Sequence, residues 1–313
     1  MKFKLFIIMS AVLIAVSGCR SEKKYKIAYN VLYDMEKDNY EVFVMDMDGH
    51  NKKNISNREG VDWVYYAWKD KLYFISDRDT THRSYFLYEM DAEGKNVRKI
   101  SDLKLRDSWL GSRYDGTQII VNPHPSIDSV FYIQDLDGKK LKTVETGLAF
   151  ASDPIFSPDG SRIIFRGSIK KSKREKGFVD ELYSINEDGS DLRRLTHYPP
   201  NDTTAKWYAY KAGPPKWNNR DNFISYQSQQ KGKYSLFAVT PDGEKQWKLT
   251  GNPVNEGWHE WSSDGNWLAV EIFDLSESQF HIALMDWRAK EMTVLTDSSY
   301  KYQQAPVFVE VLE

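Results

Sequence analysis

The chain has 313 residues, of which 43 are lysine or arginine and 45 are aspartate or glutamate, so its formal net charge at neutral pH is only −2. Acidic and basic residues are interspersed, and this balance gives no electrostatic basis for binding nucleic acid. The single cysteine cannot form an internal disulfide, and the aromatic content of 14% suits stacked β-sheets with large side chains between them.

Residues 1–18 are predicted to be a signal peptide. Two lysines precede an apolar run over residues 5–16, which is too short to span a bilayer. The run leads into Val16-Ser-Gly-Cys19, which resembles the lipobox of bacterial lipoproteins. This resemblance implies cleavage before Cys19 and lipidation of its sulfur, so that residues 19–24 form the lipidated cysteine and a short tether. The alternative is an ordinary secretory signal followed by a chance cysteine.

The lipobox also implies a location. Several acyl chains on Cys19 would hold the protein stably to a membrane, where a single chain would not. Arg20, rather than aspartate, follows the cysteine, and the sorting rule of one bacterial group assigns such lipoproteins to the outer membrane. We therefore expect a lipid-anchored protein of the bacterial cell envelope, at the outer membrane and exposed to the periplasm.

From residue 25 onward the chain repeats a unit with a period of roughly 40–50 residues. Each unit contains a turn after an apolar strand, and five of the six copies continue to an isoleucine or leucine followed by serine or threonine, as in Leu195-Thr196. The six turns are Asp46-Met-Asp-Gly49, Asp91-Ala-Glu-Gly94, Asp135-Leu-Asp-Gly138, Asn186-Glu-Asp-Gly189, Thr240-Pro-Asp-Gly243 and the degenerate Asp286-Trp-Arg-Ala289.

The clearest unit covers residues 152–196. A first hairpin turns at Pro158, which presets φ, and at Gly160, which can take the positive φ that closes the turn. A second hairpin turns at residues 186–189. Four short antiparallel strands make one sheet that cannot bury both of its faces alone, so the period and the strand count are typical of a β-propeller blade.

The two ends of the chain are predicted to complete one blade together. The first strand of a unit ends in an aromatic residue, at Trp68, Tyr114, Phe156, Trp217, Trp261 and Phe308. The unit that starts at Tyr25 lacks its own first strand, and residues 304–309 can supply it, which leaves no open edge. The predicted fold is all-β: a six-bladed β-propeller of four-stranded antiparallel blades, closed by a C-terminal strand that completes blade one.

The repeat resembles that of the TolB propeller. The resemblance rests on residues 154–165 with 182–196, on 72–78 with 87–94, and on 261–270, and it extends over residues 25–313. The α/β domain that precedes the propeller in TolB has no counterpart here, so the resemblance implies a TolB-like propeller lipoprotein without that domain.

Strand alternation places every connection at one of two ends of the propeller axis. The tight Asp-Gly turns lie at one end, which we call the tight-turn end. The links from second to third strand and from blade to blade lie at the other, the long-loop end, where the chain lengthens at residues 31–40, 167–180 and 197–214. Long loops on a rigid scaffold usually carry function, so we expect the site at the long-loop end.

The candidate ligand-binding residues at this end are aromatic residues and histidines: Trp109, His124, Trp207, Tyr208, Tyr210, Trp258 and His259. Aromatic platforms with imidazoles could hold a glycan or a peptide. Alternatively, the tryptophans wedge between blades and the histidines lie singly on solvated loops. No two histidines share a metal-ligand spacing, so we predict neither a metal site nor a cofactor. The basic run over residues 170–176 is read as a solvated loop.

Two functions fit this pattern. The first is a monomeric, non-catalytic scaffold that binds an envelope protein or a glycan through the long-loop end. The alternative is a polysaccharide-active enzyme resembling the propeller oligogalacturonate lyases, which hold a metal with histidines in the channel mouth. That alternative requires His124, His197 and His259 to converge on the axis. No Gly-x-Ser-x-Gly motif supports a serine hydrolase.

Overall fold

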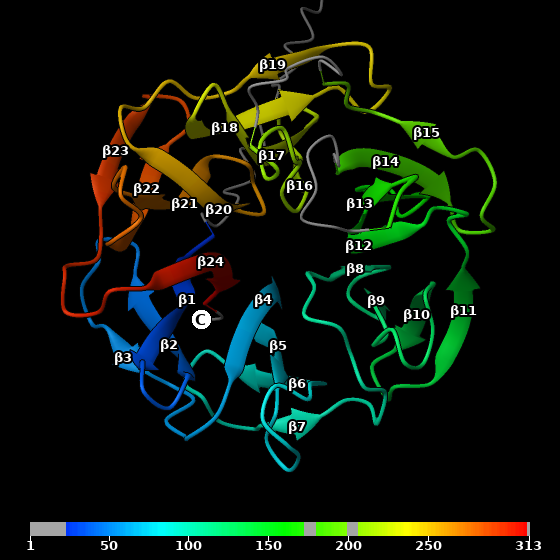
Figure 1. The fold of residues 1–313 in the computed structure, drawn as a ribbon. Coiled ribbons are helices and arrows are strands. Elements are labelled where there is room, and N and C mark those ends of the chain that lie inside the picture. The colour runs from blue at the N-terminus through cyan, green and yellow to red at the C-terminus, as the bar shows by residue number, and fades with distance from the viewer. Residues whose placement is uncertain (1–22, 172–179, 199–205, 312–313) are drawn as a thin grey trace, which may run out of the picture.

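The computed structural model describes residues 23–171, 180–198 and 206–311. These residues form six four-stranded antiparallel sheets around a central axis (Figure 1). The prediction of a six-bladed, all-β propeller is therefore confirmed. The predicted signal peptide, Cys19 and most of the basic run lie outside the described residues, within which no helix is long and apolar enough to cross a membrane.

Each blade is numbered by its place in the chain, and its strands run in order from the axis to the periphery. Blade one contains β24 (Gln303–Glu310), β1 (Tyr25–Asp34), β2 (Asn39–Asp46) and β3 (Lys53–Asn54), and blade two contains β4 (Asp62–Trp68), β5 (Lys71–Ser76), β6 (Phe86–Asp91) and β7 (Arg98–Lys99). Blade three contains β8 (Gly111–Arg113), β9 (Gln118–Val121), β10 (Phe131–Asp135) and β11 (Lys140–Val144), and blade four contains β12 (Phe150–Phe156), β13 (Arg162–Ser168), β14 (Glu181–Asn186) and β15 (Arg193–Arg194). Blade five contains β16 (Lys216–Asn218), β17 (Phe223–Gln230), β18 (Lys233–Val239) and β19 (Gln246–Lys248), and blade six contains β20 (Asn255–Trp261), β21 (Trp267–Phe273), β22 (Phe280–Asp286) and β23 (Glu291–Val294).

The C-terminal strand closes the ring as predicted. β24 pairs antiparallel with β1, with Ile27 opposite Phe308 and Tyr25 opposite Glu310. Phe308 is 7% exposed and packs edge-on against Tyr25 at 5.7 Å between ring centroids. Both termini of the described chain therefore lie at the tight-turn end, where the other blades have the turn between their first two strands.

A hydroxyl group explains why the repeats end in serine or threonine. The Thr196 hydroxyl accepts a hydrogen bond from the Leu182 backbone N–H at 2.9 Å, and Thr296 accepts one from Ile282 at the same distance. Equivalent bonds join Val42 to Ser56 at 2.9 Å and Leu236 to Thr250 at 3.3 Å. Beyond the end of the short outer strand, the hydroxyl accepts a hydrogen bond from a backbone N–H of the third strand. This buried donor therefore has a partner.

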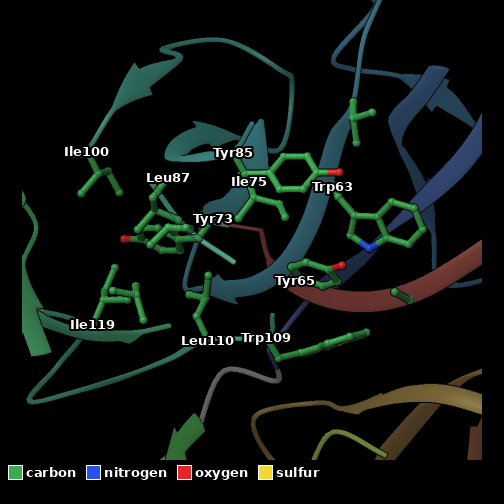
Figure 2. Close-up of a cluster of buried hydrophobic side chains, with 14 residues drawn as sticks. Trp63, Tyr65, Tyr73, Ile75, Tyr85, Leu87, Ile100, Trp109, Leu110 and Ile119 are labelled. Atoms are coloured by element: carbon green, nitrogen blue, oxygen red, sulfur yellow. The ribbon is translucent and has the colours of Figure 1, made fainter. Parts of the chain in front are cut away.

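The hydrophobic core is divided among the spaces between neighbouring blades. The buried cluster between blades two and three, for example, joins Ile75 and Leu87 of one sheet to Ile119 of the next (Figure 2). Buried clusters between the other neighbouring blades are built in the same way. Each blade thus covers the apolar face of the next, which makes the ring one cooperative unit.

Candidate functional site

Aromatic side chains pack together on the axis at the long-loop end. Trp109 lies 4.2 Å from Tyr65 and 5.0 Å from Trp258 between ring centroids, and Trp63 lies 6.1 Å from Trp258. These residues come from blades two, three and six, and Figure 2 shows Trp63, Tyr65 and Trp109 facing one another. Two candidate residues, Trp109 and Trp258, are therefore brought together, as parts of a packed cluster. Trp109 is only 7% exposed.

A network of charged groups adjoins this cluster. The Asp153 carboxylate, 1% exposed, accepts hydrogen bonds from the Trp109 backbone N–H at 3.1 Å and from Arg166 Nε at 2.6 Å. Arg166 also lies 3.6 Å from Asp180. The Tyr65 hydroxyl donates to Asp107, and burial raises the pKa of the Asp107 carboxyl. None of these charged residues was predicted from the sequence as a site residue.

Asp153 has a φ of +57°, in the left-handed region that favours glycine. A register shift in the pairing of β12 with β13 falls at the same place, between Ser152 and Ile155. The resulting β-bulge turns the Asp153 carboxylate toward blade three, where Ser108 donates a further hydrogen bond to it at 3.1 Å. This backbone strain is held by buried hydrogen bonds, as is common at functional positions.

The rim of the long-loop end carries exposed apolar side chains. Leu275 is 77% exposed, Ile169 is 75% exposed and Met35 is 59% exposed, and these are the most exposed large hydrophobic residues in the described chain. Each lies in the link between the second and third strands of its blade. Ile127 and Trp207 extend this set in two further links. We call these five residues the apolar rim.

The remaining candidates are distributed over this end. His124 lies in the link after β9, and its Nδ1 is 2.8 Å from the Ser126 hydroxyl. Trp207 packs edge-on against Tyr208 at 5.4 Å, and Tyr210 lies 6.0 Å from Tyr198. Trp207, Tyr208 and Tyr210 therefore lie in the link before blade five, apart from the axial cluster of Trp109 and Trp258.

His259 lies within a strand, so the alternative interpretation that places the histidines on solvated loops does not hold for it. It sits inside β20, 3% exposed, with Nε2 2.7 Å from the Ser225 hydroxyl. Trp261 Nε1 donates to the same hydroxyl at 2.8 Å, so Ser225 can donate its own hydrogen to a neutral imidazole. Burial lowers the pKa of His259 to about 3. The imidazole therefore stays uncharged between blades five and six.

The tight-turn end is hollowed at the axis, whereas we expected the binding site at the opposite end. Two cavities of about 360 and 280 Å³ share part of their lining, including Trp68 of blade two and Trp217 of blade five. Blades two and five lie on opposite sides of the ring (Figure 1). Because residues of both blades line both cavities, the cavities open on the axis. Their walls also carry three pairs of opposite charge, namely Lys23–Glu310, Lys69–Asp115 and Lys216–Glu260.

The described part of the chain offers no set of ligands for a catalytic metal ion. Within residues 23–171, 180–198 and 206–311 there is no group of three or more histidine, cysteine, aspartate or glutamate side chains placed to hold a metal ion. His124 and His259 have separate serine partners, on blades three and five. The convergence that the lyase hypothesis requires is therefore not found in the described part of the chain.

Residues 65–309 match the family model of the TolB beta propeller domain. The Tol-Pal system protein TolB of Anaeromyxobacter dehalogenans is 24% identical over 173 residues, which cover 53% of this chain and only 37% of that protein. The crystal structure of TolB from Acinetobacter baumannii superposes with a TM-score of 0.66 at 15% identity, covering 91% of this chain and 66% of the other. An oligogalacturonate lyase from Vibrio parahaemolyticus gives a TM-score of 0.51 at 13% identity, covering 88% and 75%. At these identities the two structural likenesses establish the fold alone.

Proposed function

Because this chain belongs to the TolB β-propeller domain family, we propose that it is a non-catalytic binding protein of the bacterial cell envelope. In this proposal Cys19 carries the lipid anchor, and the long-loop end of the ring contacts an envelope protein. A protein partner is favoured over a glycan because the matched relative is named as a component of the Tol-Pal system.

The apolar rim is the observation that carries this proposal. Leu275, Ile169 and Met35 expose most of their apolar surface on links that the rigid sheets hold in place. These side chains come from different blades but share one end of the ring, and we take that end as the interaction surface. Burying each of them against a partner would contribute about 1.5–3 kcal/mol before the costs of association.

The charged network supports binding rather than catalysis. One Asp153 oxygen accepts hydrogen bonds from blade three and the other accepts one from Arg166, while Asp107 accepts one from the Tyr65 hydroxyl. These carboxylates therefore hold blades three and four and the aromatic cluster in place. With no convergent set of histidines on the axis of the described chain, no observation favours the lyase alternative over the scaffold.

Site-specific photo-crosslinking in living bacteria tests the proposal. A photoreactive phenylalanine analogue is placed at Leu275 or at Ile169, and at Tyr114 as a control. Tyr114 is also an exposed apolar residue, at 56%, but it lies at the tight-turn end.

We expect one discrete protein adduct from both rim positions and none from Tyr114. Adducts from Tyr114 alone would move the partner to the other end of the ring, and no adduct from any position would overturn the scaffold. Release of unsaturated products from oligogalacturonate by the purified protein, with or without added Mn²⁺, would overturn the non-catalytic assignment.

A further inference from the structure

The described chain starts at the mouth of the larger axial cavity. Lys23 lines that cavity, and its ammonium group donates to Glu310 and, at 3.0 Å, to the Ser263 hydroxyl. The Val311 N–H donates to the Lys24 carbonyl oxygen at 2.9 Å. These contacts join the first described residues to blade six and to the closing strand, so they fix the position of Lys23 at the tight-turn end.

The distance from Lys23 to the proposed anchor is short. Cys19 precedes Lys23 by four positions, and four residues span at most about 14 Å even when fully extended. β1 alone has ten residues, which is roughly 33 Å of strand from the tight-turn end to the long-loop end. A lipid on Cys19 cannot therefore place its membrane at the long-loop end.

We infer that the tight-turn end lies against the membrane that carries the anchor, with the axial cavities facing the lipid head groups. This orientation rests on the proposed lipidation of Cys19. It leaves the apolar rim as the surface that a folded partner can reach, because the opposite end is covered by the bilayer.

The chemistry of the tight-turn end suits a head-group layer. Four cations line the cavities, and each is paired with a carboxylate: Lys23 with Glu310, Lys69 with Asp115, Lys216 with Glu260 and Arg113 with Glu187. The paired charges therefore favour neither anionic nor neutral lipid. Tyr114 projects from this end with 56% of its surface exposed, and tyrosine is a residue that favours membrane–water interfaces.

Two single-cysteine variants of the full-length protein test the orientation. Asn219→Cys lies in the link between β16 and β17 at the tight-turn end, and Lys231→Cys lies between β17 and β18 at the other end of the same strand. Both positions are exposed, and the eight residues of β17 separate them by roughly 26 Å. Cys19 is the only native cysteine, so its acylation leaves each introduced thiol as the only labelling site.

Each variant is purified in its lipidated form, labelled with an environment-sensitive fluorophore and reconstituted into phosphatidylethanolamine–phosphatidylglycerol vesicles that contain a head-group quencher lipid. Thermal unfolding of both labelled variants confirms that the ring is intact. We expect quenching of the label at position 219 and no quenching at position 231.

The reverse pattern, equal quenching at both positions, or no quenching of a vesicle-bound protein would overturn the orientation while the anchor stands. Failure of the protein to bind vesicles, together with an unmodified Cys19 thiol, would overturn the anchor and the orientation with it. The photo-crosslinking result at the apolar rim is independent of both.

Discussion

Gly94, in the turn after β6, lies directly against the carbonyl oxygen of Ile55, at the end of the preceding blade. Its φ is +78°, and a Cβ atom at this position would clash with that carbonyl. Gly49 of blade one has the same relation to Leu295 of blade six, at the point where the ring closes. A Cβ atom on Gly49 would lie 2.8 Å from the Leu295 carbonyl oxygen. The turn glycine of one blade is thus a contact point for the outer edge of its neighbour.

Gly94→Ala should therefore destabilise the ring in two ways. An alanine at positive φ costs about 1–2 kcal/mol, and the clash with a backbone carbonyl forces blades one and two apart. We expect a loss of more than about 2 kcal/mol in the free energy of unfolding, measured by urea denaturation. Gly251→Ala is the matched control, because nothing lies within 4 Å of its Cβ position and its φ is not positive. Equal stability of the two variants would contradict the contact.

The sequence alone predicted the parts of this interface but not their contact. The Asp-Gly turn and the Ile/Leu–Ser/Thr ending are local patterns, and their recurrence gave the blade count and the closure by β24. Turn chemistry and strand alternation are set by neighbours in sequence, which is why they can be read directly. The contact between Gly94 and Ile55 depends on the angle between two blades, which no local pattern encodes.

Removing the closing strand should abolish cooperative folding. Deletion from Gln303 onward strips β24 from β1 and removes the buried side chains of Ala305, Val307, Phe308 and Val309. Each large apolar side chain contributes about 1.5–3 kcal/mol, against a total stability of about 5–15 kcal/mol for a protein. We expect loss of the thermal unfolding transition monitored by circular dichroism. Deletion of residues 312–313 alone is the control and should leave the transition unchanged.

Glu271 should make the ring less stable as the pH rises. It is 4% exposed beside Gly257, and the Ala305 N–H of the closing strand donates to it at 3.3 Å. Burial raises the pKa of Glu271 from 4.5 to about 8. The native protein keeps a proton that the unfolded chain releases, so the contribution of Glu271 to stability is complete below pH 4.5 and is lost as the pH rises to about 8.

Glu271→Gln keeps the acceptor for the Ala305 N–H and removes the titration. The variant should match the parent at the acid end of this window and exceed it at pH 8 by on the order of 3 kcal/mol, by urea denaturation. Some decline should remain, since burial also raises the pKa of Glu181 to about 7. If the difference in stability between the parent and Glu271→Gln did not change between pH 4.5 and pH 8, the assignment would be wrong.

His259 should act with the opposite sign. Its folded-state pKa of about 3 lies below the ordinary 6.5, so between these pH values the unfolded chain binds a proton that the native protein does not bind. Stability is therefore lost as the pH falls from 6.5 toward 3, and His259→Gln should reduce that loss in acid denaturation. Partner crosslinking from Leu275 should be unchanged in this variant. A fall in crosslinking without a change in stability would restore His259 as a binding residue.

Two β-bulges explain why the site was harder to predict than the fold. The pairing of β20 with β21 shifts register between Glu256 and His259, as β12 does between Ser152 and Ile155. An extra residue reverses the alternation of side chains along a strand, so His259 is buried and Asp153 turns toward blade three. Trp109 and Trp258 could be placed near the axis because each lies near the start of a first strand, whose position the repeat defines.

Cys19→Ser should release the protein from the membrane fraction. The buried apolar clusters are packed between blades, and the tight-turn end carries paired charges, so acyl chains on Cys19 would supply nearly all of the membrane affinity at that end. Lipidation contributes about 0.8 kcal/mol per buried CH₂ group, far more than the interfacial contact of a single tyrosine. Fractionation of cells, with immunoblotting of the soluble and membrane fractions, measures the change. Ser17→Ala leaves the cysteine in place and is the control. If the Cys19→Ser protein stayed with the membrane while remaining folded, the anchor would have to be sought in another part of the chain.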